Sequence, residues 1–140
     1  GGRIGIAAQS IGIGRSALEE GIRYARERKQ FGARVVDFQS TRWKIADAAT
    51  DLEAARLLVY HAAKLRDAGE THTKEAAMAK LFASRAANRI AYDSLQMHGG
   101  VGYTQEFIIE RLFRDARVTE LYEGTSEIQR LVIAAALLRE

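Results

Sequence analysis

Residues 73–98 read TKEAAMAKLFASRAANRIAYDSLQMH, and the pair Gly99-Gly100 follows. This stretch decides the fold class, because its apolar side chains recur at the three- and four-residue spacing of a helix. These side chains are Ala76, Ala79, Leu81, Phe82, Ala86, Ile90, Ala91 and Leu95. We therefore predict one long helix that begins at Thr73 and stops at the glycine pair.

Helical spacing extends to both sides of this stretch. The other predicted helices are residues 3–29 with Gly32 as a C-terminal cap, a helix that begins at Asp37 or Ser40 and ends near Ala68 before Gly69, a short helix near residues 106–114, and a helix that begins at Thr125 or Ser126. No segment predicts a strand. Four principal helices with short connections favour an all-α fold, a four-helix up-and-down bundle, in a single domain.

The composition supports this fold and excludes several kinds of site. The 140 residues contain no proline, which agrees with long helices because a proline inside a helix costs ~3 kcal/mol. They contain no cysteine, which excludes disulfides and thiolate metal sites and is compatible with an intracellular compartment, either the cytoplasm or the mitochondrial matrix of a eukaryote. The longest apolar run, residues 131–138, is far shorter than the ~18 residues of a membrane span. The net charge of +3 comes from interleaved acids and bases, so neither a membrane nor a nucleic acid is an expected partner.

Neither a dinucleotide-binding glycine motif nor a histidine metal site is supported by the sequence. Residues 12–17, GIGRSA, match a dinucleotide-binding glycine pattern, but that pattern requires a preceding strand, and here it lies within a predicted helix. We interpret these glycines as positions of close helix packing. The histidines His61, His72 and His98 are scattered, so no metal site is expected.

Two glycine-containing segments allow both a structural and a functional interpretation. Residues 26–32, RERKQFG, place cations at a predicted helix end, where they complement the helix dipole. The same arginines are also able to bind a pyrophosphate with paired hydrogen bonds. Residues 96–103, QMHGGVGY, form either an ordinary helix stop or a loop whose glycines let a ligand approach the backbone. Spacing alone does not separate these interpretations.

The third segment, Tyr122-Glu123-Gly124-Thr125, precedes the last predicted helix. Thr125 or Ser126 is a suitable N-cap, which leaves Glu123 as an incidental upstream residue. Alternatively, Glu123 is a base beside a glycine that leaves its approach open, and the free amides of the helix start bind anionic groups of a cofactor. A carboxylate that is removed from water becomes more basic, which suits the removal of a weakly acidic carbon-bound proton.

Together and in this order, these segments resemble the C-terminal helical domain of the acyl-CoA dehydrogenases. The resemblance covers essentially the whole chain, and it is carried by residues 26–32, 38–39, 96–103, 114–116 and 122–130. It implies that the fold is that domain's helical bundle. It also implies oxidation of an acyl-CoA thioester to the trans-2-enoyl-CoA, with FAD as the cofactor that receives the hydride. With a glutamate at position 123, the chain resembles the short- and medium-chain branches of the family, above all the butyryl-CoA dehydrogenases.

The resemblance also implies roles for individual residues. Glu123 matches the catalytic base, and its backbone amide is expected to bind the thioester carbonyl. Arg3 and Gly124 match substrate-binding positions. The matched FAD-binding residues are Arg28, Lys29, Gln30, Phe31, Phe38 and Gln39, which face the FAD of a neighbouring subunit, then Gln96, Met97, His98, Gly99 and Gly100 near its adenosine end, and Thr125 and Glu127 within the same subunit.

The family also carries an N-terminal helical domain and a middle β-domain, and residues 1–140 match neither of them. We therefore expect this chain to be a single C-terminal domain that is inactive when isolated, to form a dimer or tetramer, and to belong to an enzyme that passes electrons to an electron-transfer flavoprotein. Two alternatives remain at this stage. One is a non-catalytic helical oligomerisation module, and the other is an acyl-CoA oxidase-like domain.

Overall fold

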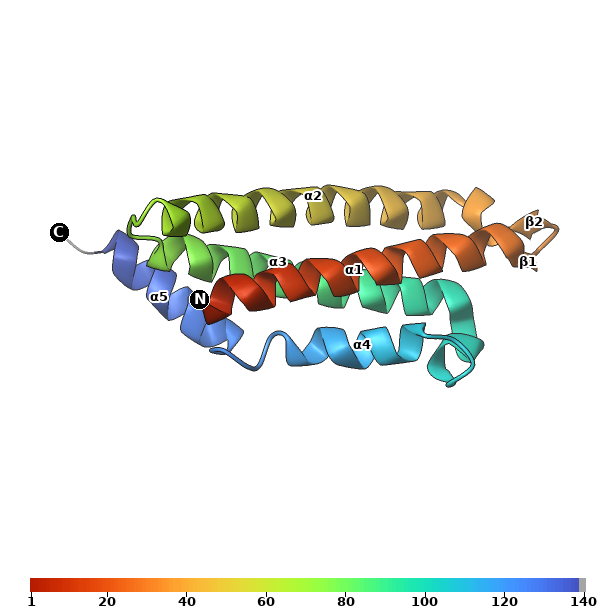
Figure 1. The fold of residues 1–140 in the computed structure, drawn as a ribbon. Helices are drawn as coiled ribbons and strands as arrows, with labels where there is room; N and C mark the ends of the chain where they lie inside the picture. Colours follow the sequence, from red (N-terminus) through yellow and green to blue (C-terminus); the bar gives the residue numbers. More distant parts are fainter. Residues whose placement is uncertain (139–140) are drawn as a thin grey trace.

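The computed structural model describes residues 1–138, which form five α-helices and one small hairpin (Figure 1). The elements are α1 Gly2–Glu27, β1 Lys29–Gln30, β2 Ala33–Arg34, a 3-10 turn Val35–Asp37, α2 Gln39–Asp67, α3 Thr73–His98, a second 3-10 turn Gly99–Tyr103, α4 Ile109–Val118 and α5 Ser126–Leu137. The all-α prediction is therefore confirmed, and α3 has the predicted bounds.

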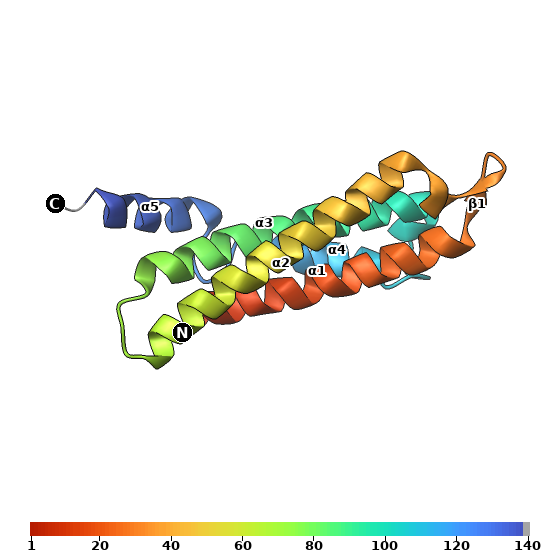
Figure 2. The same cartoon turned by 90° about the horizontal axis from the view of Figure 1, so that it is seen from above.

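Helices α1 to α4 run alternately up and down the long axis of the molecule (Figures 1 and 2). Helix α3 contacts each of the other four helices, so it is the centre of the bundle. The short helix α4 packs against α1 and α3 and completes the bundle, whereas α5 packs against α3 beyond the end of α4. The predicted bundle is thus correct in its topology, but its fourth member is α4 rather than the last helix.

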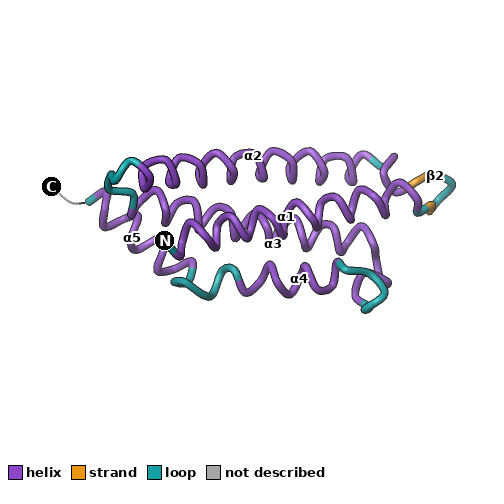
Figure 3. The backbone as a smooth tube through the Cα atoms, viewed as in Figure 1, coloured by secondary structure: helices purple, strands orange, loops and turns teal. Residues whose placement is uncertain are grey.

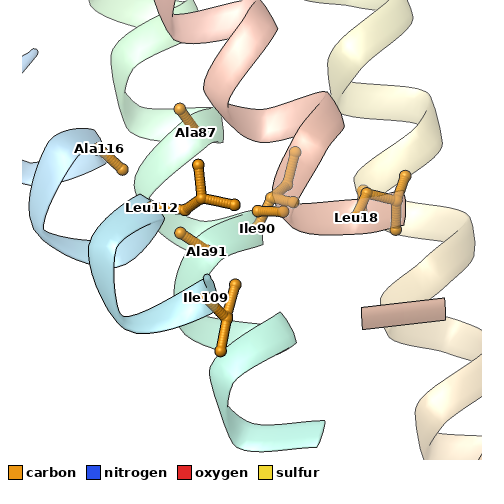
Figure 4. Close-up of a cluster of buried hydrophobic side chains, with 9 residues drawn as sticks. Leu18, Ala87, Ile90, Ala91, Ile109, Leu112 and Ala116 are labelled. Atoms are coloured by element: carbon orange, nitrogen blue, oxygen red, sulfur yellow. The ribbon is translucent and has the colours of Figure 1, made fainter. Parts of the chain in front are cut away.

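The bundle core is rich in alanine, which allows the helices to approach closely. One cluster of buried apolar side chains joins α1, α2, α3 and α4 and includes Leu18, Ile90 and Ile109 (Figure 4). A second cluster joins α1, α2 and α3 through Ile4 and Val59 and several alanines. The predicted close packing at the glycines of residues 12–17 is confirmed at Gly14, where a side chain would press on Leu52 of α2 and on α3. It is wrong at Gly12, which is exposed and has nothing within 4 Å of such a side chain. Gly21 packs closely as well, against Ser94 of α3.

The hairpin of β1 and β2 was not predicted. Lys29 pairs with Arg34, and Gln30 pairs with Ala33, in antiparallel register. The two turn residues between these strands have positive φ angles, 53° at Phe31 and 78° at Gly32. Positive φ angles at both residues are typical of the two-residue loop that connects the strands of a β-hairpin. Glycine adopts such an angle without steric cost. Gly32 is therefore a hairpin residue and not the cap of α1, which ends at Glu27.

The remaining connections are short loops (Figure 3). Gly69, with a φ of 73°, follows the end of α2 as predicted. The short fourth helix lies a few residues later than predicted, at Ile109–Val118. Among the described helices, none combines the length and the apolarity that crossing a membrane requires.

Candidate active site

The turn between α4 and α5 carries Glu123 in an uncommon backbone conformation. Its φ angle is 53°, and that of the following Gly124 is 89°. A left-handed φ costs a non-glycine residue roughly 1–2 kcal/mol, and such residues concentrate at functional sites. Helix α5 begins directly after this turn. The Thr125 side chain accepts a hydrogen bond from the Ile128 amide at 3.4 Å, so of the two predicted N-cap residues, Thr125 and Ser126, Thr125 is the N-cap.

Hydrogen bonds from three helices hold this turn. The Tyr122 hydroxyl donates to Gln9 Oε1 of α1 at 2.6 Å. Gln129 Nε2 of α5 donates to the Glu123 carbonyl at 3.2 Å and to the Gly124 carbonyl at 2.9 Å. Lys80 Nζ of α3 donates to the same Gly124 carbonyl at 2.8 Å. Burial lowers the pKa of the Lys80 ammonium, partly offset by the nearby Glu120 carboxylate.

The Glu123 carboxylate lies beside a small hollow at the start of α1. The hollow has a volume of about 310 Å³ and is lined by Gly1, Gly2, Arg3, Ile4, His72, Thr73, Ala76 and Glu123. The predicted substrate-binding residue Arg3 thus shares a hollow with the predicted base. A side chain at position 2 would overlap with the Glu123 carboxylate, so Gly2 is what makes room for it. His72 and Thr73 belong to no motif in the sequence that indicates this site, and they reach it only because α3 begins beside the start of α1.

The carboxylate of Glu123 has no hydrogen-bonding or ion-pair partner within residues 1–138. It forms no ion pair or side-chain hydrogen bond there, and the residue is exposed. The Glu123 N–H likewise has no backbone acceptor in the described part of the chain. A free carboxylate and a free N–H on one residue are able to accept a proton and to donate a hydrogen bond to an oxygen. The expected burial of this carboxylate is not supplied by the described residues.

The predicted FAD-binding residues separate into two groups at opposite ends of the bundle. Thr125 and Glu127 follow Glu123 at the end where α1 begins, whereas the β1–β2 hairpin lies at the other end (Figure 1). Helix α1, with 26 residues, separates these ends by about 39 Å at 1.5 Å per residue. One copy of this chain therefore does not bring both groups to one dinucleotide.

The hairpin end presents cations and an aromatic ring to solvent. Arg28, Lys29 and Gln30 are exposed, and Phe31 is 93% exposed. Neither Arg28 nor Lys29 forms an ion pair within residues 1–138. The Phe31 ring meets the Phe38 ring edge to face at 6.4 Å between centroids, and Gln39 is exposed at the start of α2. This cluster suits an anionic ligand with a planar ring.

The loop after α3 lies at the same end, but two of its predicted ligand contacts point inward. The side chains of Met97 and His98 are buried. His98 stacks on Tyr24 at 4.2 Å between centroids and bonds the Ser94 carbonyl at 2.7 Å through Nδ1. Gln96 and the backbone of Gly99 and Gly100 are exposed, and a side chain at either glycine would meet nothing within 4 Å. Any ligand contact here therefore falls to Gln96 and to the glycine backbone.

His98 instead joins a polar contact with α1. Its Nε2 lies 3.5 Å from Glu20 Oε1, and Arg23 binds the same carboxylate at 2.6 Å. The hydrogen bond from Arg23, assisted by His98, lowers the pKa of Glu20 below its ordinary value. At the opposite end, hydrogen bonds from its own backbone amide and from Thr125 lower the pKa of Glu127. Both carboxylates are therefore ionised at neutral pH.

A larger and more apolar hollow lies away from Glu123. It has a volume of about 630 Å³ and is lined by Asp51, Leu58, Met78, Leu81, Phe82, Arg85, Ala86, Arg89, Glu120 and Ile133 of α2, α3, α5 and the α4–α5 connection. Asp51 and Arg89 form an ion pair in it. None of the predicted site residues lines this hollow.

Comparisons with known proteins agree on one family. The acyl-CoA dehydrogenase C-terminal domain matches residues 1–138. The chain is 54% identical over 139 residues to the caffeyl-CoA reductase-Etf complex subunit CarC of Acetobacterium woodii, covering 99% of this chain and 37% of that protein. It is 54% identical over 138 residues to the human mitochondrial short-chain specific acyl-CoA dehydrogenase, covering 99% of this chain and 34% of that protein.

Comparison with solved structures identifies the same family. The butyryl-CoA dehydrogenase of Megasphaera elsdenii superposes with a TM-score of 0.96 at 46% sequence identity, covering 99% of this chain and 36% of that chain. The present chain thus spans about a third of the length of the relatives that it matches.

Proposed function

The chain belongs to the acyl-CoA dehydrogenase family, in the part that forms the C-terminal domain, and from this premise we propose that it supplies the catalytic base for the α,β-dehydrogenation of an acyl-CoA thioester. The observation that carries the proposal is the turn at Glu123, a residue that lines a hollow together with Arg3 and whose carboxylate and N–H are both unpaired within residues 1–138. The likeness to short-chain and butyryl-CoA dehydrogenases favours a short straight-chain substrate.

In this proposal Glu123 performs the acid–base step. Its carboxylate accepts the proton from the α-carbon, and its N–H donates a hydrogen bond to the thioester oxygen, on which negative charge develops as the proton leaves. Gly124 leaves the approach to the carboxylate without a side chain, and Arg3 lies where it favours an anionic or electron-rich group of the substrate. Positioned general base catalysis contributes about 10²–10⁴-fold to the rate.

The donor set of the chain fits FAD, although not within one copy. When bound, FAD accepts the hydride that leaves the β-carbon. Arg28, Lys29 and Phe31 suit a pyrophosphate and a ring system, and the glycine loop at 99–100 leaves its backbone open to a ligand. Because Thr125 and Glu127 lie at the other end of the bundle, we assign the two groups to FAD sites that two copies share.

The site requires elements beyond the present residues. Glu123 is exposed, and residues 1–138 offer one wall of a site and nothing that would enclose a substrate. We therefore propose that turnover requires further protein elements of the kind that the longer relatives contain, and that residues 1–140 in isolation do not turn over substrate. An electron-transfer flavoprotein is the proposed redox partner, in line with the name of the Acetobacterium woodii relative.

The same residues also support the reverse reaction, and one relative favours this direction. The Acetobacterium woodii relative is named a caffeyl-CoA reductase. In that direction Glu123 would donate a proton to the α-carbon of the enoyl thioester, and FAD, when bound in its reduced form, would supply the hydride for the β-carbon. Assays with butyryl-CoA plus an electron acceptor, and with crotonyl-CoA or an aryl-acrylyl-CoA plus reduced flavoprotein, distinguish the two physiological directions.

The direct test is Glu123→Gln in the full-length, FAD-loaded protein. We expect loss of butyryl-CoA oxidation and of solvent deuterium exchange into the substrate α-carbon by about 10²–10⁴-fold, with the FAD absorbance unchanged. The matched control is Glu53→Gln, an exposed carboxylate on α2 that pairs with Arg56. Normal exchange in Glu123→Gln would refute the base assignment and favour a non-catalytic assembly module. Oxidation with molecular oxygen as sole acceptor would instead favour an oxidase.

A further inference from the structure

Two buried polar side chains lie beneath the turn that carries Glu123. Lys80 of α3 and Gln129 of α5 are both fully buried, with 0% exposure. Lysine is almost never fully buried in proteins unless it is paired. Lys80 forms no ion pair with the described residues, and its ammonium instead donates to the Gly124 carbonyl at 2.8 Å. Its position therefore needs an explanation beyond packing.

The two side chains converge on consecutive carbonyls. Gln129 Nε2 lies 3.2 Å from the Glu123 oxygen and 2.9 Å from the Gly124 oxygen, and Lys80 Nζ is the second donor to the latter. Both carbonyls thus point into the protein, toward buried donors. Both residues have positive φ angles, so the two buried donors bind the carbonyls of the two residues that adopt the left-handed backbone.

We propose that Lys80 and Gln129 are positioning residues for the proposed base: by holding the carbonyls of Glu123 and Gly124 inward, they aim the Glu123 carboxylate and N–H outward into the hollow shared with Arg3. This inference rests on the proposed function of Glu123. Without the two donors, the backbone of Glu123 has a lower-energy alternative at negative φ, which would rotate both catalytic groups away.

The cost of burying Lys80 supports a positioning role. Burial disfavours the charged ammonium, as the lowered pKa of this lysine indicates, so an apolar side chain of similar length would pack at this position more favourably. A charged donor to a carbonyl forms a shorter and stronger hydrogen bond than a neutral one. Burial of Lys80 therefore costs folding stability, and its hydrogen bond fixes the geometry of the turn at Glu123 and Gly124.

The test uses the full-length, FAD-loaded protein with Lys80→Met, which keeps the length of the side chain and removes its donor. We expect kcat and α-carbon deuterium exchange to fall about 10- to 100-fold, with KM for butyryl-CoA and the FAD absorbance nearly unchanged. Amide hydrogen exchange at residues 119–125 should become faster. Lys64→Met, at an exposed position on α2, is the matched control and should leave all of these values at the parent level.

A second control separates positioning from general loss of stability. Ile90→Ala removes buried volume from the same helix without contacting the turn, and it should lower the thermal midpoint while kcat below that midpoint stays at the parent value. If Lys80→Met does not fold, Gln129→Met decides, since it removes the other donor and is expected to lower kcat in the same way.

The outcomes separate this inference from the proposed function. Parent-like kcat and exchange in a folded Lys80→Met protein, with Glu123→Gln inactive, would overturn the positioning role alone. A Lys80→Met protein that loses kcat only in proportion to its stability, as Ile90→Ala does, would also overturn it. Parent-like exchange in Glu123→Gln would overturn the base assignment and this inference together.

Discussion

At Glu123 the backbone φ angle is 53°, and at Gly124 it is 89°. A glycine adopts this conformation freely, whereas a glutamate does so only where its surroundings require it. Here the requirement comes from Tyr122, which is bound to α1, and from the donors Lys80 and Gln129 beneath the turn. Single residues thus account for the geometry of the proposed base, although the atoms that enforce it come from three helices.

At the residue scale, Glu20 is expected to make the stability of the chain depend on acid pH. Its folded pKa lies below its ordinary value of 4.5 because Arg23 donates to the ionised carboxylate. The folded chain therefore binds this proton more weakly than the unfolded chain does. The stabilisation is fully present above pH 4.5 and is lost as the pH falls through the lowered folded pKa.

We predict that Glu20→Gln removes part of this dependence. The fall in unfolding free energy between pH 6 and pH 3, measured by urea denaturation, should be smaller than in the parent by at most about 1 kcal/mol. The control is Glu19→Gln, because Glu19 is mostly exposed and its contact with Arg15 is longer, at 3.7 Å. An identical pH dependence in the parent and in Glu20→Gln would contradict the prediction.

At the scale of elements, α1 and α3 are held together by small residues. A side chain at Gly21 would lie 2.8 Å from Ser94 Oγ and 3.3 Å from the Ser94 Cα of α3. Gly12, on the exposed side of the same helix, has no neighbour within 4 Å of such a side chain. The two glycines have the same backbone role and opposite environments, so they form a matched pair.

We predict opposite effects for alanine at these positions. Gly21→Ala should destabilise the chain by about 1–2 kcal/mol, because overpacking outweighs the gain in helix propensity. Gly12→Ala should stabilise it by about 0.5–1 kcal/mol. Chemical denaturation followed by circular dichroism measures both changes. Equal shifts for the two variants would mean that helix propensity alone decides and that the α1–α3 contact is not tight.

At the scale of the whole molecule, the bundle leaves large apolar side chains exposed. On α5 and directly after it, Leu131, Leu137 and Leu138 are 66%, 64% and 80% exposed, and on α2 Trp43 is 61% exposed. Exposed apolar surface of this kind drives association. The division of the predicted FAD-binding residues between the two ends of the bundle likewise calls for more than one copy.

We therefore predict that the isolated chain self-associates into a dimer or a tetramer. Sedimentation equilibrium over a hundredfold range of concentration measures this, and Leu131→Glu combined with Leu137→Glu should shift the distribution toward monomer. Arg15→Glu, on the exposed face of α1, changes the charge without removing apolar surface and is the control. A parent chain that is monomeric throughout would contradict the prediction and weaken the proposal of shared FAD sites.

The amino-acid sequence alone is enough to predict the helices, their approximate ends and the family. Periodic apolar residues and glycine stops are local signals, so α3 was predicted with the bounds that it has. The hairpin at 29–34 was missed, because a two-residue strand has no periodicity to read and its turn depends on the φ angles of Phe31 and Gly32. Glu123 was identified because its neighbouring residues form a distinctive motif along the chain.

Which residues contact one another follows from the packing of the helices and cannot be predicted from the sequence. Lys80 lies on the same face of α3 as Ala76, Ala83 and Ala87, and a lysine on a core face was the one signal that pointed to it. Its hydrogen bond to Gly124 joins residues far apart in sequence, as does the hollow that combines Arg3, His72 and Glu123. Such contacts arise from the way in which the helices pack. The spacing of residues along the sequence indicates only which residues share a face of one helix.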